Sequence, residues 1–144
     1  MKHFAMDLGL ADLALDAHGC ASLCVDGQIE IHFEHDATAD AIHLYSHLAP
    51  LPAEGREAFY LQLLQANLLG AHTAGATLAI DDAAQAVVLC LQITPWHCES
   101  RDFAALVERF VDAAAHWRER LAGPQPAVQA IALPQPPAGP AFFA

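Results

Sequence analysis

Apolar and polar residues alternate in two runs of the chain, residues 21–25 and 28–34, on either side of Asp26-Gly27. Alternation with a period of two is typical of strands that bury one face. An Asp-Gly pair between two such runs favours a tight turn in which both central residues have positive φ. The pattern therefore predicts a β-hairpin. The residues that it directs toward the core are Ile29, Ile31 and Phe33.

A second predicted hairpin consists of residues 76–81 and 86–94. The run from Val87 to Leu91 is apolar without interruption, which is typical of a strand covered on both faces. After the first hairpin, residues 41–48 alternate and indicate a third strand. The residues of this strand directed toward the core are Ile42, Leu44 and Leu48.

Three other segments follow a helical spacing of three to four residues. The first covers residues 2–15 and the second covers residues 54–69. The third begins at Ser100, which can cap a helix, and stops at Gly123-Pro124. The predicted order is thus helix, three strands, helix, two strands, helix. This order indicates an α+β fold with a twisted, mostly antiparallel sheet packed by helices.

The predicted middle helix has two apolar stripes rather than one. At about 100° per residue, Phe59, Leu63 and Ala66 share one side of the helix. A surface helix of a monomer needs only one apolar stripe, which packs on its own core. A second stripe therefore indicates a homodimer interface. The residues of this predicted interface are Leu61, Leu64 and Leu68.

Length and charge restrict the class of protein. The 144 residues suffice for one domain with one core. The 17 acidic residues exceed the 6 Lys and Arg residues and give a formal net charge of -11. Nucleic-acid binding needs a basic surface, so we expect no nucleic-acid partner and, by the same sign of charge, no membrane partner. A negative field favours solubility and a basic partner.

The composition changes near the C-terminus. Residues 123–144 carry no charged side chain and hold 6 of the 9 prolines. Such a segment cannot build a core. We therefore predict one folded domain over residues 1–122 and a disordered, Pro-rich tail over residues 123–144.

The chain is expected to be cytoplasmic. Asp7 follows the initiator methionine too closely for a signal peptide, and no apolar run has the length of a membrane span. Thiols stay reduced in the cytoplasm. The cysteines expected to be free thiols are Cys20, Cys24, Cys90 and Cys98.

Residues that could carry catalysis or bind a metal do not occur in a recognisable pattern. The chain has no Gly-rich phosphate loop and no nucleophile elbow. His43 and His47 would share a strand face, but strand rise separates them by about 13 Å. Cys20 and Cys24 lack the second Cys pair of a zinc site. We therefore expect no catalytic residue, no cofactor and no metal; a meeting of His32 with His43 or His47 across strands stays open.

The ordered set of these elements resembles a known family, the class I chaperones of bacterial type III secretion, or Tir-chaperone (CesT-like) family. The resemblance covers about residues 5–121. The chain departs from the family in a first helix that is short at its N-terminus and in the Pro-rich tail. The matching segments are Leu8-Gly9-Leu10, Asp26-Gly27, residues 64–70, residues 75–81, residues 87–93 and the helix from Phe103 to Trp117.

The resemblance implies a homodimer that binds the N-terminal region of one or more secreted effector proteins in extended form, without ATP. It also implies presentation of the effector to the export apparatus or its secretion ATPase. From the residues themselves, we expect the effector segment to pair with an edge of the first hairpin and to cover an apolar patch. The residues expected to line that patch are Phe4, Leu8, Ile29, Ile31 and Phe33.

Two other functions remain open from the sequence alone. A regulatory protein of the same fold would sequester a secretion regulator in place of an effector. A small enzyme of unrecognised type would need a pocket in which titratable side chains converge, for which only the histidines are candidates.

Overall fold

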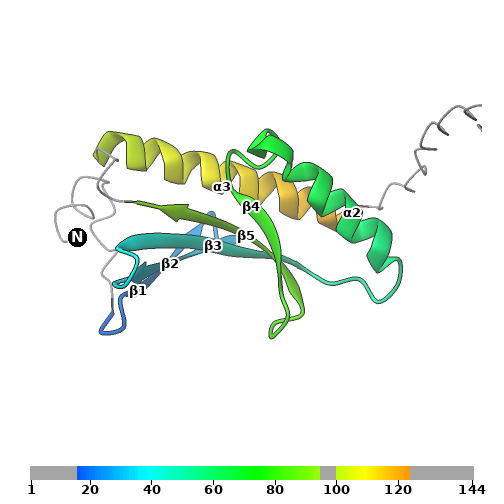
Figure 1. Cartoon of the computed structure of the whole chain (residues 1–144), viewed down its shortest axis with the longest axis horizontal. Helices are drawn as coiled ribbons and strands as arrows, with labels where there is room; N and C mark the ends of the chain where they lie inside the picture. The colour runs from blue at the N-terminus through cyan, green and yellow to red at the C-terminus, as the bar shows by residue number, and fades with distance from the viewer. Residues whose placement is uncertain (1–15, 95–99, 124–144) are drawn as a thin grey trace, which may run out of the picture.

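The computed structural model describes residues 16–94 and 100–123 of the chain. They form one five-stranded antiparallel sheet with two helices on the same face (Figure 1), which confirms the predicted α+β class. The predicted first helix, the tail beyond residue 123, Trp96 and Cys98 lie outside the described residues. The elements are β1 (Cys20–Val25), β2 (Ile29–Asp36), β3 (Ala41–Pro50), α2 (Arg56–Ala66), the 3-10 turn η1 (Leu68–Gly70), β4 (Thr77–Asp81), β5 (Ala86–Ile93) and α3 (Ser100–Ala122).

The strand order in the sheet is β1-β2-β3-β5-β4, so β1 and β4 are its edges. The turn between β1 and β2 has the predicted conformation. Asp26 and Gly27 have φ angles of 51° and 66°. The Gln28 N–H donates to the Val25 carbonyl at 3.1 Å, which closes the turn. The tight Asp-Gly hairpin is therefore confirmed.

Helix α3 lies along the sheet and supplies much of the core (Figure 1). Its apolar residues recur every three to four positions, as the sequence predicts, and the helix ends just before Gly123. The Trp117 indole N–H donates to the His72 carbonyl at 2.8 Å and ties α3 to the loop that follows η1. No helix in the described segments is long and apolar enough to cross a membrane. The α3 residues buried against the sheet include Phe103, Val107, Phe110, Ala114, Trp117 and Leu121.

The opposite face of the sheet has no helix over it among the described residues. In β5, Val87 and Leu89 are fully buried toward the helices, whereas Val88 and Cys90 on the other face are half-buried. The prediction that β5 is covered on both faces is therefore wrong. Its uninterrupted apolar run faces the core with alternate residues only, because both α2 and α3 lie on one side of the sheet (Figure 1).

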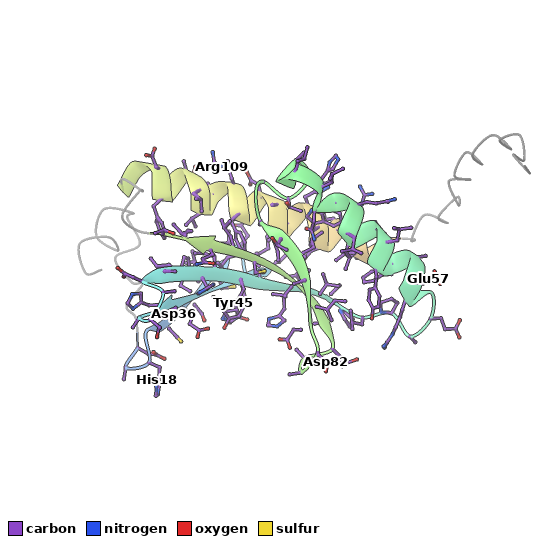
Figure 2. The ribbon with its side chains drawn as sticks, viewed as in Figure 1. His18, Asp36, Tyr45, Glu57, Asp82 and Arg109 are labelled. Atoms are coloured by element: carbon purple, nitrogen blue, oxygen red, sulfur yellow. The ribbon has the colours of Figure 1, made fainter. Side chains whose placement is uncertain are left out.

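Strand β3 contains a bulge near its end. Its partner on β5 changes register between His47, opposite Val88, and Ala49, opposite Val87, so Leu48 has no direct partner. Leu48 is nevertheless buried, as predicted. A bulge increases the local twist of a sheet. In Figure 2, the β4–β5 turn, labelled at Asp82, lies on the side of the sheet away from α3.

Candidate functional site

The predicted second stripe of α2 is exposed. The side of the helix formed by Phe59, Leu63 and Ala66 is buried on the core, as expected. On the other side, Leu64 is 68% exposed. The large hydrophobic residues that are exposed in the described segments all belong to α2, η1 and β4. They are Leu61, Leu64, Leu68, Leu69 and Ile80.

Helix α2 ends earlier than the sequence predicts. The helical apolar pattern continues to Leu69, but the helix stops at Ala66 and a 3-10 turn follows. Leu69 and Gly70 have positive φ angles of 57° and 66°, which an α-helix does not allow. Gly70 is required there, because a Cβ atom on it would lie 3.0 Å from the Gly75 Cα atom. Leu68 and Leu69 therefore project from this turn rather than from the helix.

The two edges of the sheet differ. At the outer edge of β4, the Leu78 N–H donates to Asn67 Oδ1 at 2.8 Å, and the Asn67 Nδ2 donates to the Leu78 carbonyl at 3.0 Å. Strand β1 has no strand on its outer side within the described residues. Unpaired backbone groups at an edge are a template for another strand. At Cys20, the first residue of β1, Asp16 bonds both backbone groups: the Cys20 N–H donates to Asp16 Oδ1 at 2.9 Å, and the Asp16 N–H donates to the Cys20 carbonyl at 2.7 Å. A further strand therefore fits along β1 beyond Cys20.

A groove lies between this edge and α3, with a volume of about 290 Å³. Leu23 and Val25 of β1 form one side of it. The other side is α3, which also contributes the carboxylates of Glu108 and Asp112. The residues that make its wall mostly apolar are Leu23, Val25, Ala104, Val107 and Val111. We call these residues the β1 groove.

The predicted effector-binding residues are only partly at this surface. Ile29 is partly buried, but Ile31 and Phe33 are 0% and 3% exposed. The expectation that Ile31 and Phe33 line an exposed patch is therefore corrected, because α3 packs on the face of β2 that they occupy. Phe4 and Leu8 lie outside the described residues.

The groove residues were not singled out from the sequence, although a signal was present. Leu23 and Val25 alternate with Ser22 and Cys24, and they pair across the hairpin with Ile31 and Ile29. They therefore share the inner face of the sheet with the core residues of β2. Because β1 is an edge, the residues that the structure describes leave this part of the inner face open between the strand and α3.

The open face of the sheet carries a cluster of rings. The His32 ring stacks on Tyr45 with centroids 4.9 Å apart, and His47 meets both rings edge-on. Ser22 Oγ and His32 Nδ1 are hydrogen-bonded at 2.9 Å. The histidine pair that the sequence left open thus does form between His32 and His47. In the described segments, no group of three or more His, Cys, Asp or Glu side chains is placed to hold a metal ion.

A carboxylate and a thiol lie on the same face of the sheet as the His32–Tyr45–His47 ring cluster. The His47 Nε2 atom lies 3.0 Å from Asp81 Oδ2, and this hydrogen bond is the main reason that the pKa of Asp81 is lowered. Burial raises the pKa of the Cys90 thiol, which donates to the Thr77 carbonyl. Cys20, Cys24 and Cys90 are free thiols. Figure 2 shows Tyr45 on the face of the sheet opposite Arg109 of α3.

Comparisons with known proteins give a consistent result. A model of the Tir chaperone protein (CesT) family matches residues 1–118. A Chlamydia pneumoniae protein, CPj0713/CpB0740, is 28% identical over 119 residues, which cover 81% of this chain and 89% of that protein.

Solved structures share the fold. A chain of the ExsC-ExsE complex matches with a TM-score of 0.67 and 26% identity, covering 82% of this chain and 87% of that one. A chain of the ExoU-SpcU complex from the type III secretion system of Pseudomonas aeruginosa matches with a TM-score of 0.63 and 21% identity. That match covers 79% of this chain and 93% of that one.

Proposed function

The chain belongs to the Tir chaperone protein (CesT) family, and from this premise we propose how it holds its partner. It is a chaperone for effector proteins of type III secretion. We propose that it works in the cytoplasm as a homodimer. In this proposal it binds the N-terminal region of an effector in extended form, needs no ATP and delivers the effector to the export apparatus.

The effector segment is proposed to add a strand to the sheet beside β1. The edges support this choice, because Asn67 bonds Leu78 within the short strand β4, whereas the bonds from Asp16 to β1 are at Cys20, its first residue. No strand lies outside β1 among the described residues. Strand addition satisfies backbone groups of both chains and makes few demands on sequence. An effector that must stay unfolded for export can be held in this way.

The β1 groove is the observation that carries this proposal. It lies directly beside the β1 edge, and its wall includes Leu23 and Val25 of that same strand. A strand paired with β1 would direct every second side chain toward α3 and hence into the groove. Apolar side chains there would leave water, at roughly 25 cal/mol per Å² of apolar area. Binding and release then need no ATP, since the site is open and no core has to be rebuilt.

The homodimer is proposed to form through the exposed side of α2 and the η1 turn that follows it. The residues proposed to meet across it are Leu61, Leu64 and Leu68, which are 42%, 68% and 69% exposed. Covering them would gain roughly 1–2 kcal/mol for each leucine. Their position on α2 and η1, away from the β1 groove at the other edge of the sheet, would leave both grooves of a dimer accessible.

The test places a charge in the groove. The probe is the N-terminal segment of a secreted protein that co-purifies with this chain, and its affinity is measured by calorimetry. Val111→Glu should weaken binding about tenfold or more, because a carboxylate in an apolar groove loses its hydration on binding. Ala105→Glu, on an exposed position of α3, adds the same charge as a control and should leave affinity within twofold.

Hydrogen exchange supplies the second readout. Binding of the same fragment should slow amide exchange in β1, because an added strand protects the outer N–H groups of this edge. Unchanged exchange in β1, together with equal affinities of the Val111→Glu and Ala105→Glu variants, would place the effector elsewhere.

A further inference from the structure

The sheet layer carries the net charge of the described residues. Residues 16–55 and 67–94, which form the five strands and their loops, contain nine acidic residues and no Lys or Arg. All five described arginines belong to the helices, Arg56 to α2 and the other four to α3. Helix α3 has an equal number of acidic residues. The helical layer is thus close to neutral, and the sheet is strongly negative.

The open face of β2 presents two of these charges next to the β1 edge. Glu30 and Glu34 are exposed and alternate with His32 on this face. Tyr45 lies on the neighbouring strand β3. Burial raises the pKa of the Tyr45 hydroxyl, and the nearby Glu34 carboxylate raises it further. The charge of Glu34 therefore acts on a group of the neighbouring strand β3.

The side chains of β1 that lie between these glutamates and the edge are small, and at Cys20 the Asp16 carboxylate lies on the outer side, bonded to the Cys20 N–H at 2.9 Å. Cys20 pairs with Glu34, Ser22 with His32, and Cys24 with Glu30 across the β1–β2 ladder. Neighbouring strands are about 5 Å apart, so a strand added beside β1 would run about 10 Å from β2. A long basic side chain of the added strand can extend over the Cys and Ser side chains of β1. A glutamate side chain of β2 extends toward it, and together the two side chains span that distance. The flat His32–Tyr45 stack offers a guanidinium an aromatic face as well.

An added strand must also obey the alternation of the sheet. Leu23 and Val25 face the β1 groove, whereas Ser22 and Cys24 face the open side. Successive side chains of a strand point to opposite faces. A segment paired with β1 therefore sends one set of side chains to the apolar groove and the other set toward Glu30 and Glu34.

The negative charge of the open face of the sheet restricts which kind of molecule can bind beside β1 on that face. A second copy of this face would repel the first, and the phosphates of nucleic acids or anionic lipids would be repelled as well. We propose that the effector segment bound at β1 alternates apolar with basic residues, the apolar ones in the groove and the basic ones paired with Glu30 and Glu34. This inference rests on the proposed function and adds a sequence rule for the effector.

Three synthetic peptides of equal length test the rule against the full-length protein. Ile occupies every second position in each, and the positions between hold Arg, Ser or Glu. Fluorescence anisotropy should rank Arg above Ser above Glu, with Arg binding about tenfold tighter than Ser at about 50 mM salt, from two or three exposed charge pairs. The advantage of Arg should fall to less than about threefold at 1 M salt, where charges are screened beyond about 3 Å.

Two double variants separate local pairing from overall charge. Glu30→Gln with Glu34→Gln should weaken binding of the Arg peptide about five- to tenfold and leave the Ser peptide unchanged. Glu54→Gln with Glu119→Gln removes the same charge at exposed positions away from β2 and should change neither affinity by more than twofold. Circular dichroism confirms that both variants are folded.

The outcomes distinguish the two proposals. Equal affinity of the Arg and Ser peptides, or equal loss in both double variants, would overturn the alternation rule and leave the β1 site standing. If none of the peptides binds whereas the effector fragment does, the β1 site itself is wrong and the rule falls with it.

Discussion

The side-chain amide of Asn67 hydrogen-bonds to both backbone groups of Leu78, accepting at 2.8 Å and donating at 3.0 Å. An asparagine amide has the same donor and acceptor as a peptide unit. It can therefore take the place of a neighbouring strand at one position of the β4 edge. This residue closes the β4 edge at Leu78, as Asp16 closes the β1 edge at Cys20.

Asn67→Ala should destabilise the fold by about 1–3 kcal/mol, because it leaves the N–H and carbonyl of Leu78 without partners in a part-buried site. Urea unfolding at equilibrium measures the effect. Gln65→Ala, two residues earlier and exposed, is the matched control and should change stability by less than about 0.5 kcal/mol. Equal unfolding midpoints for the two variants would contradict this role of Asn67.

Leu64→Glu combined with Leu68→Glu should convert the protein to a monomer, because the charges replace apolar contact at the proposed α2 interface. Light scattering on a size-exclusion column should then give 15.4 kDa, against twice that mass for the unaltered chain. Ala58→Glu, on an exposed position of the same helix, is expected to stay dimeric. A wild-type protein that elutes as a monomer at micromolar concentration would refute the interface.

Ser46→Ala should leave stability unchanged or raise it by up to about 1 kcal/mol. Ser46 is fully buried in β3, and its hydroxyl has no hydrogen-bond partner among the described residues. Removing a buried hydroxyl that makes no bond removes a desolvation cost and leaves no new unpaired group. Thermal unfolding of the two proteins measures the difference. A loss of more than 1 kcal/mol would mean that the hydroxyl has a partner.

His47→Ala should raise the pKa of Asp81 toward its ordinary value of 3.8, because the hydrogen bond from His47 is the largest cause of its lowering. A carboxyl whose pKa is lower in the folded state stabilises the fold above the unfolded pKa, and the gain is lost as pH falls through the folded value. The contribution of this pair is therefore present at neutral pH, begins to fall near pH 3.8 and is lost as the pH drops through the lower pKa of the folded state. Carboxyl NMR titration of both proteins measures the shift, and identical curves would exclude it.

Sequence features that depend on neighbouring residues predicted the fold well. Features that depend on contacts between residues far apart in the sequence were not predicted. The Asp26-Gly27 turn and the apolar stripe of α3 depend on neighbours in sequence, and both agree with the structure. The end of α2 does not, because the apolar pattern continues through Leu69 while the backbone there takes positive φ.

The candidate site shows the same division. Alternation places Ile31 and Phe33 on the inner face of β2, but it cannot tell whether a helix of the same chain or an effector covers that face. Helix α3 covers it. The exposed side of α2 was predictable, because Leu64 lies opposite a stripe that the core must bury. Leu68 is exposed as well, but it lies on η1.

The separation of charge between the sheet and helices gives the molecule an electric dipole, with its negative end on the sheet. A cationic polypeptide approaching from solution is turned toward that end before any contact forms. The association rate constant should therefore fall as ionic strength rises, while dissociation, set by the groove and the backbone ladder, changes less. A basic effector segment would in this way meet the sheet, and with it the β1 edge, early in its encounter with the chaperone.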